Sequence, residues 1–142
     1  MNILYPAKIT FNKSDKRYFV KFYDLKEAVT EGETLKEALH NATEVLTLTL
    51  EGRVDEELEI PRPSIQQAKN IYYIAPSARV QAALLVKLSR GEHSIAKLAR
   101  TLHSSWPAIS RLENPRHWPS LRQLERTAFA MGQRLILSLE AV

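Results

Sequence analysis

The stretch LARTLHSSWPAISRLE, from Leu98 to Glu113, holds the residues of this chain whose types could do chemistry. His103, Ser104 and Ser105 place an imidazole next to two hydroxyls, which are the groups of nucleophilic catalysis. That chemistry also needs an acid to orient the imidazole and donors for an oxyanion. The sequence contains no acid partner for this pair and no GxSxG elbow. We therefore predict no catalytic residue and do not expect an enzyme.

Metal and cofactor sites are not expected either. The chain has no cysteine, and its histidines lack the short spacing of metal ligands: His40, His93, His103 and His117. With four glycines and no P-loop or GxGxxG motif, phosphate-cradling loops are absent from the sequence. A nuclease would need carboxylates that converge on two metals, but the acids of the N-terminal half fall in turns and at strand ends. We predict neither metal nor cofactor.

The charges divide the chain into two halves of opposite sign. Residues 1–60 carry 8 Lys/Arg against 12 Asp/Glu, a net charge of −4, and residues 61–142 carry 12 against 4, a net charge of +8. A basic half is attracted to phosphate backbones, whereas an acidic half attracts basic proteins. The N-terminus shows no signal-peptide pattern and no apolar run reaches a membrane span. We expect a cytoplasmic protein with no membrane partner.

The elements of the N-terminal half follow from its periodicity. Alternating residues from Tyr5 to Phe11 and from Tyr18 to Tyr23 predict a hairpin, with turn formers between the two strands. A short third strand is expected over residues 28–30, ending at Glu31-Gly32. Thr34 and Glu37 fit a capping box before a helix with an apolar stripe of about four turns. An extended segment around Ile60 and a strand over residues 71–74 complete the order β-β-β-α-β.

This half resembles the N-terminal domain of HicB-type antitoxins. The resemblance rests on RYFVKFYDLKEAVTEGETLKEALHNATEVL, a hairpin followed by a T-x-G-x-T strand exit and an Ala-rich helix. It implies a partial RNase H-like domain over residues 1–75 that has lost nuclease chemistry and that binds a HicA-like ribonuclease toxin. Tyr23 stands where many members place a proline, so the local turn is expected to differ. Aromatic and acidic residues are the predicted toxin contacts: Tyr18, Phe22, Tyr23, Asp24 and Glu31.

The second half, residues 76–142, has the pattern of an all-α helix-turn-helix domain. Ser77, Ser94 and Ser105 are candidate N-caps, and Gly91 and Gly132 follow predicted helix ends. Prolines 115 and 119 separate the later helices. Ile109 and Leu112 are expected to face inward, and Trp118 is expected in the core. The whole chain is thus predicted to be an α+β protein.

This half resembles the Cro/phage-repressor-like (XRE) family across residues 94–135. The matching residues keep the family spacing: Leu98-Ala99, Ser105, ISRLE at 109–113, PSL at 119–121, Leu124, Ala128, Ala130, Gly132 and Leu135. Glu113 would be expected to hold the turn, or an arginine, in place. His103 replaces a glycine that supplies a positive φ, Ser104 replaces a buried valine, and Ile95 replaces a glutamine that contacts phosphate.

The resemblance implies that the second helix enters the major groove of operator DNA. Ser94 and Ser105 would present helix N-termini to phosphates, and Arg116 would lie near a phosphate strand. Trp106, Ala108, Ser110 and Arg111 are the candidates for groove contact, with Arg111 suited to guanine. Two alternatives stay open. Arg111 is a solvated surface residue or pairs with Glu113, and Trp106 packs in a dimer or against the N-terminal domain.

Residues 135–140 alternate again and predict a terminal strand with no partner in its own half. Pairing with a second copy would make a homodimer, or a tetramer, with the symmetry of a palindromic operator. The expected function is an antitoxin that neutralises its toxin and represses its own operon. The alternatives are a stand-alone repressor with an N-terminal ligand-sensing domain and, more distantly, an enzyme of RNase H type.

Overall fold

The computed structural model describes residues 1–141 of the chain. These residues divide into two compact units, one up to residue 81 and the other from residue 82 on. The predicted boundary after residue 75 lies just before helix α2 (Ala78–Arg90), whereas the observed division falls within that helix. Each unit is described by itself.

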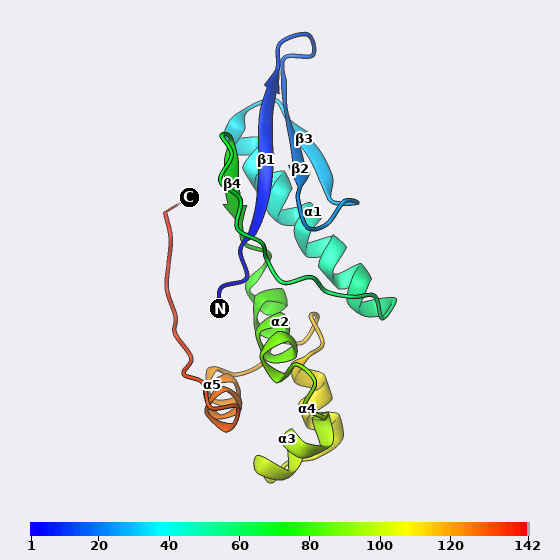
Figure 1. Cartoon of the computed structure of the whole chain (residues 1–142), viewed down its shortest axis with the longest axis vertical. Helices are drawn as coiled ribbons and strands as arrows, with labels where there is room; N and C mark the ends of the chain where they lie inside the picture. The colour runs from blue at the N-terminus through cyan, green and yellow to red at the C-terminus, as the bar shows by residue number, and fades with distance from the viewer. Residues whose placement is uncertain (142) are drawn as a thin grey trace. The chain divides into compact units, whose positions relative to one another are not determined.

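The first unit is a four-stranded antiparallel sheet with one long helix. Its elements are β1 (Tyr5–Asn12), β2 (Arg17–Phe22), β3 (Val29–Gly32), α1 (Leu35–Asp55) and β4 (Ile71–Ile74). The strands lie in the order β3-β2-β1-β4, and every neighbouring pair is antiparallel. Figure 1 shows α1 behind the strands, so that one face of the sheet carries a helix and the other does not. The predicted order β-β-β-α-β is confirmed.

The hairpin forms where the alternation predicts it. Ile9 stands opposite Val20 and Ala7 opposite Phe22, and these four side chains are buried on the α1 side. The Asn12 side chain closes the turn by accepting the backbone N–H of Ser14 at 2.9 Å. β3 ends at Gly32, as predicted, and Glu31 and Gly32 pair with β2.

Helix α1 is longer than its predicted four turns and runs to Asp55. Its buried stripe continues through Leu46 to Leu50, which keeps the last turns packed. The Thr34 hydroxyl caps the helix by accepting the Glu37 N–H at 3.1 Å, as predicted. The Glu37 carboxylate, however, accepts the N–H of Glu33 and not that of Thr34. The return bond of the capping box is therefore displaced by one residue.

Gly32 explains the close approach of β3 to α1. A Cβ atom built on Gly32 would lie 2.5 Å from the backbone nitrogen of Ala38, far inside van der Waals contact. Any side chain at this position would push the strand off the helix. The glycine of the T-x-G-x-T strand exit is thus required by packing.

The second unit is helical. Helix α2 is followed by α3 (Ile95–Thr101), α4 (Trp106–Leu112) and α5 (Leu121–Ala130), which Figure 1 labels and shows joined by loops. Gly91 and Gly132 follow α2 and α5 with φ of +58° and +72°, as expected of glycines after helix ends. Ser120 opens α5 with a full capping box to Gln123.

The cap predicted at Ser77 is wrong. The Ser77 hydroxyl is buried and makes no hydrogen bond within residues 1–141. The start of α2 is fixed instead by other bonds inside the first unit. The Thr47 hydroxyl accepts the Ser77 N–H at 3.0 Å, and Arg79 forms an ion pair with the buried Glu51 of α1.

Candidate functional site

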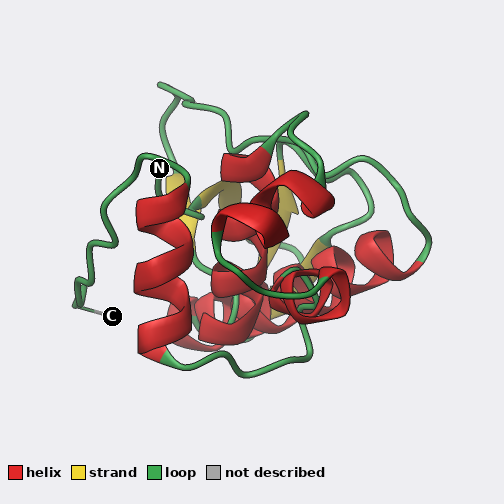
Figure 2. Cartoon of the chain, turned by 90° about the horizontal axis from the view of Figure 1, so that it is seen from below, coloured by secondary structure: helices red, strands yellow, loops and turns green. Residues whose placement is uncertain are grey.

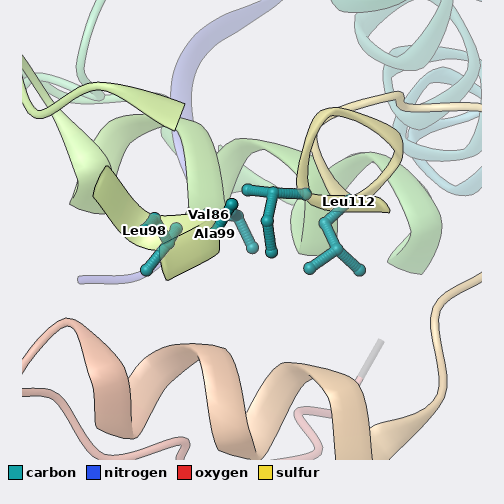
Figure 3. Packing of buried hydrophobic residues seen from close by; sticks show 5 residues of the cluster. Val86, Leu98, Ala99 and Leu112 are labelled. Atoms are coloured by element: carbon teal, nitrogen blue, oxygen red, sulfur yellow. The ribbon is translucent and has the colours of Figure 1, made fainter. Parts of the chain in front are cut away.

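A buried cluster fixes the two short helices of the second unit against each other. Leu98 and Ala99 of α3 meet Ile109 and Leu112 of α4, with Val86 of α2 between them (Figure 3). Ala99 and Ile109 are 5% and 2% exposed, so the prediction that Ile109 faces inward is confirmed. The cluster leaves one side of α4 in solvent.

The predicted caps of these helices form. The Ser94 hydroxyl accepts the Lys97 N–H at 3.0 Å, and the Ser105 hydroxyl accepts the Ala108 N–H at 3.2 Å. Ser105 is therefore a structural cap, which accounts for its place next to the histidine without catalysis. Pro107 lies in the first turn of α4, where its missing N–H does no harm.

His103 takes the left-handed conformation that its alignment with a family glycine predicts. Its φ is +50°, and its N–H donates to the Arg100 carbonyl at 3.1 Å. The next N–H, of Ser104, donates to the Ala99 carbonyl at 2.8 Å and completes the turn between α3 and α4. Ser104 is exposed where the family has a buried valine. Ile95 packs on the buried cluster, so it cannot replace the phosphate-binding glutamine.

The solvent side of α4 carries the predicted groove-contact residues. Trp106 is 55% exposed and Arg111 is exposed, while Ala108 and Ser110 are half-buried. Arg111 does not pair with Glu113, because Arg90 occupies that carboxylate at two points. The alternative that Arg111 pairs with Glu113 is therefore wrong, whereas the alternative of a solvated surface residue stays open. The Arg111 guanidinium makes no ion pair within the described residues.

The loop after α4 differs from expectation at one residue. Trp118 is 69% exposed, so its predicted place in the core is wrong. Pro115 is fully buried at the end of α4, and the chain that follows it runs at the surface. Arg116 is exposed there, and its N–H donates to the Asn114 side chain at 2.9 Å.

Residues 133–141 form neither helix nor strand in the single chain and are drawn as loop in Figure 2. The predicted strand pairing with a second copy stays a prediction. Large apolar side chains are exposed along this segment and on α5: Phe129, Ile136, Leu137 and Leu139. A groove of about 1280 Å³ lies between the end of α3, α5 and the first residues of this segment.

The predicted toxin contacts of the first unit do not share one surface. Phe22 is 5% exposed and packs on the α1 side with Val20, so its place in a contact surface is wrong. Tyr18 points to the same side, half-buried, with its ring centroid 4.9 Å from that of Phe11. Tyr23 is exposed.

The two predicted acidic contacts already have partners within the fold. Asp24 accepts the Ser64 N–H at 3.0 Å, and Glu31 forms an ion pair with Arg17 at 3.0 Å. Both residues are half-buried. Their carboxylates therefore stabilise the loop and the strands that they contact, in addition to carrying negative charge. The exposed acids lie mainly elsewhere, in α1 and in residues 55–59.

One buried phenol has a perturbed acidity. The Tyr5 hydroxyl donates to the Pro61 carbonyl at 2.7 Å and fixes the extended segment after α1 to the sheet. Burial, with the negative charge of Asp24 as a second cause, raises the pKa of Tyr5 to about 12. This is the signature of a packed core tyrosine, since it faces no groove.

Within residues 1–141, no three His, Cys, Asp or Glu side chains gather as metal ligands would. The helices of this part of the chain are also too short or too polar to cross a membrane.

An antiparallel sheet with one helix, followed by a cluster of short capped helices, defines the class: a two-part α+β protein with a sheet unit and a helical unit. Residues 4–88 match the family described as the HicB-like antitoxin of bacterial toxin–antitoxin systems. This is more than half of the chain. The chain therefore belongs to the HicB-like antitoxin family.

Its relatives match from end to end. The antitoxin HicB of Escherichia coli K12 is 29% identical over 134 residues, which is 94% of this chain and 96% of that protein. Antitoxin HicB 2 of Photorhabdus laumondii is 29% identical over 96% of each chain. The antitoxin HicB of Pseudomonas fluorescens is 28% identical over 99% and 97%. These proteins are named as antitoxins and not as enzymes, and membership implies a toxin partner.

Proposed function

We propose that this chain neutralises a HicA-like, mRNA-cleaving ribonuclease toxin through its first unit, in the cytoplasm. The family match carries the proposal, because residues 4–88 include the whole of the sheet and α1. The negative net charge of residues 1–60 suits a basic partner. Tyr18, Tyr23, Asp24 and Glu31 remain proposed contacts, and Phe22 is withdrawn because it is buried.

Co-expression of the full chain with the basic protein encoded beside it tests this proposal. Affinity purification through a tag on the antitoxin alone is expected to recover both proteins. The two are then expected to elute together in size-exclusion chromatography at 0.3 M salt. Glu31→Lys reverses a charge in the proposed contact and is expected to weaken the complex. Glu140→Lys, at an exposed residue of the C-terminal segment, is the charge-matched control. Separate elution of the two wild-type proteins would refute the proposal.

We also propose that the second unit binds operator DNA in the chain's own promoter, with α4 in the major groove. The support is the division of α4 into a side that buries Ile109 and Leu112 and a side that exposes Trp106 and Arg111. A guanidinium without a carboxylate partner is available to bind guanine at two points. Ser94, Ser105, Ala108, Ser110 and Arg116 complete the proposed contact set.

A gel shift with the promoter fragment tests the DNA proposal. Arg111→Ala is expected to lose about 1–3 kcal/mol of operator affinity and to relax one base position. Lys36→Ala removes one positive charge from α1 and is the control. An unchanged shift for Arg111→Ala would remove this residue from the contact set.

A palindromic operator is bound by a symmetric protein, so we propose a homodimer, or a tetramer built from it. The exposed apolar residues of α5 and of the last residues support an interface at this end of the second unit. A second copy of residues 135–140 would supply the missing strand partner.

A further inference from the structure

The face of the sheet opposite α1 is here called the outer sheet face. It carries Lys8, Phe19, Lys21, Tyr23, Val29 and Tyr73, together with the ion-paired residues Arg17 and Glu31. The register fixes this membership, since side chains alternate along each strand and their partners lie on the same side. No helix of the first unit covers it, as the near side of the strands in Figure 1 shows.

Two lysines lie directly opposite each other at its centre. Lys8 of β1 pairs with Lys21 of β2, which places two exposed ammonium groups side by side. Like charges in this position destabilise a sheet. Neither lysine has a carboxylate within ion-pair distance among residues 1–141. An arrangement that costs stability in the free protein becomes favourable when an anion binds between the two groups.

Aromatic rings flank the lysine pair on both sides. Phe19 lies two residues before Lys21 along β2, and Tyr23 lies two residues after it, each about 7 Å from the lysine row. The Tyr23 N–H donates to the Pro6 carbonyl, and Pro6 pairs with Tyr73 of β4. Tyr23 and Tyr73 are therefore brought to the same edge of the lysine row, and both are exposed.

The Tyr73 ring is held in place before any ligand binds. Its hydroxyl accepts the Gln66 N–H at 3.0 Å and donates to the Gln66 carbonyl at 3.1 Å. On the other side of the lysine row, a shallow groove of about 650 Å³ is lined by Phe19, Lys21 and Val29. A fixed ring and an existing groove reduce the entropy that binding must overcome.

The acid that the register places on this surface is paired within the fold. Glu31 stands opposite Phe19 at the rim of the groove, and its carboxylate pairs with Arg17 at 3.0 Å. The outer sheet face therefore presents the two lysines as its unpaired charges, although residues 1–60 as a whole are acidic. Its charge is opposite to that of the rest of the unit.

We propose that the outer sheet face binds single-stranded nucleic acid. The lysine pair contacts the phosphate backbone, and bases stack on Phe19, Tyr23 and Tyr73. Positive charge that follows the backbone, combined with aromatic rings for stacking, is the chemistry by which sheets bind single strands without sequence preference. The outer sheet face shares Tyr23 with the proposed toxin contacts. A basic toxin would be repelled by Lys8 and Lys21, so single-strand binding here goes beyond the proposed antitoxin function and does not depend on it.

Fluorescence anisotropy with a labelled 15-nucleotide strand of mixed sequence, and full-length protein, tests the proposal. The strand is used as RNA, as DNA, and annealed to its complement. Lys8→Gln with Lys21→Gln removes two phosphate contacts and is expected to weaken binding of the single strand roughly 25-fold at 0.1 M salt. The salt slope should become less steep by about 1.4. Lys13→Gln with Lys36→Gln removes the same charge elsewhere and should change affinity less than twofold.

Two further variants separate stacking from charge and this site from the second unit. Phe19→Leu keeps an apolar side chain but loses the ring face, so it should weaken binding roughly 5- to 10-fold without changing the salt slope. Arg111→Ala should leave single-strand binding unchanged, whatever it does to operator binding. Equal affinities for RNA and DNA support a backbone-and-stacking mode, and a preference for RNA supports additional contacts to the 2′-hydroxyl.

Three results would overturn the proposal. The first is wild-type protein that binds the duplex but not the single strand. The second is an equal loss of single-strand affinity in the outer-face and control lysine variants, since the effect would then be one of net charge. Loss of toxin binding in Lys8→Gln with Lys21→Gln, without any single-strand binding in the wild type, would make the surface a protein interface instead.

Discussion

Arg90, the last residue of α2, binds Glu113, the residue after α4, through two parallel hydrogen bonds, of which Nη2–Oε1 measures 2.8 Å. Glu113 is 8% exposed, and Arg90 also donates to the His93 carbonyl. The hydrogen bond to Glu113 raises the pKa of Arg90 above its ordinary value. Arg90 lies just before α3 and Glu113 lies just after α4, so the ion pair joins the two ends of this two-helix region. It thereby fixes the position of α4 without contacting the exposed side of that helix.

Glu113→Gln is therefore expected to destabilise the second unit by about 2–4 kcal/mol, because it leaves the mostly buried guanidinium without its charge partner. Urea denaturation followed by the fluorescence of Trp106 and Trp118 measures the change. Glu125→Gln, at an exposed carboxylate of α5, is the control and should stay within about 0.5 kcal/mol. If the changes in unfolding free energy of Arg90→Met and Glu113→Leu simply add in the double variant, the two residues do not act as a pair.

Replacement of His103 by glycine is expected to stabilise the second unit by about 0.5–1 kcal/mol. The φ of +50° strains a side chain that has a Cβ, and glycine adopts this conformation freely. His93→Gly removes an exposed histidine where the backbone is not left-handed, and it should be neutral or destabilising. Calorimetric melting of the three proteins gives the comparison, and a lower melting temperature for His103→Gly would contradict a strained turn.

The buried phenol of Tyr5 predicts a loss of stability at alkaline pH. Its folded pKa of about 12 lies above the ordinary value of 10, so its contribution is complete below pH 10 and is lost as pH rises from 10 to 12. At pH 11 the loss amounts to about 1.4 kcal/mol. Tyr5→Phe should be less stable than wild type at pH 8 by about 1 kcal/mol, because the hydrogen bond to Pro61 is gone. Its stability should nevertheless fall less than that of wild type between pH 8 and pH 11.

Urea midpoints of both proteins at pH 8, 10 and 11 measure this difference. Tyr23→Phe removes an exposed phenol and controls for the general effect of alkaline pH. Parallel curves for wild type and Tyr5→Phe would show that the phenol does not ionise differently in the folded state.

Deletion of residues 136–142 is expected to convert the proposed dimer into monomers, as light scattering would show. Ile136→Ser with Leu139→Ser keeps the backbone and removes two exposed apolar side chains, so it should weaken the dimer without abolishing strand pairing. Ser138→Ala is the control within the same segment. Dimers that persist in the deletion variant would refute an interface through the C-terminal segment.

The elements of this chain could be predicted from local signals, whereas several side-chain positions could not. Ser94 and Ser105 cap helices because a serine before an apolar period has one favourable local bond to make. The same signal fails at Ser77, whose hydroxyl is buried without a hydrogen bond among residues 1–141. Its N–H donates to Thr47, which lies 30 residues earlier. Trp118 was expected inside because large rings are usually buried, but it is 69% exposed, whereas Pro115 in the same loop is buried.

The candidate surfaces show the same limit. The alternation along β2 already groups Phe22 with Val20 on one side of the strand, so its burial was within reach of the sequence. The opposition of Lys8 and Lys21 was not, because it depends on the register that the turn at Asn12 imposes. Arg90 could likewise not be predicted as the partner of Glu113, because this contact depends on how α2 packs against α3 and α4.

Inhibition of a ribonuclease toxin is the central function proposed for this chain. The most direct measurement is cleavage of a labelled mRNA by the purified toxin encoded beside it, with increasing amounts of the full-length chain. We predict that cleavage stops when antitoxin reaches a fixed ratio to toxin, and that Arg111→Ala inhibits as well as wild type. Cleavage that continues unchanged at a large excess of the chain would contradict the account.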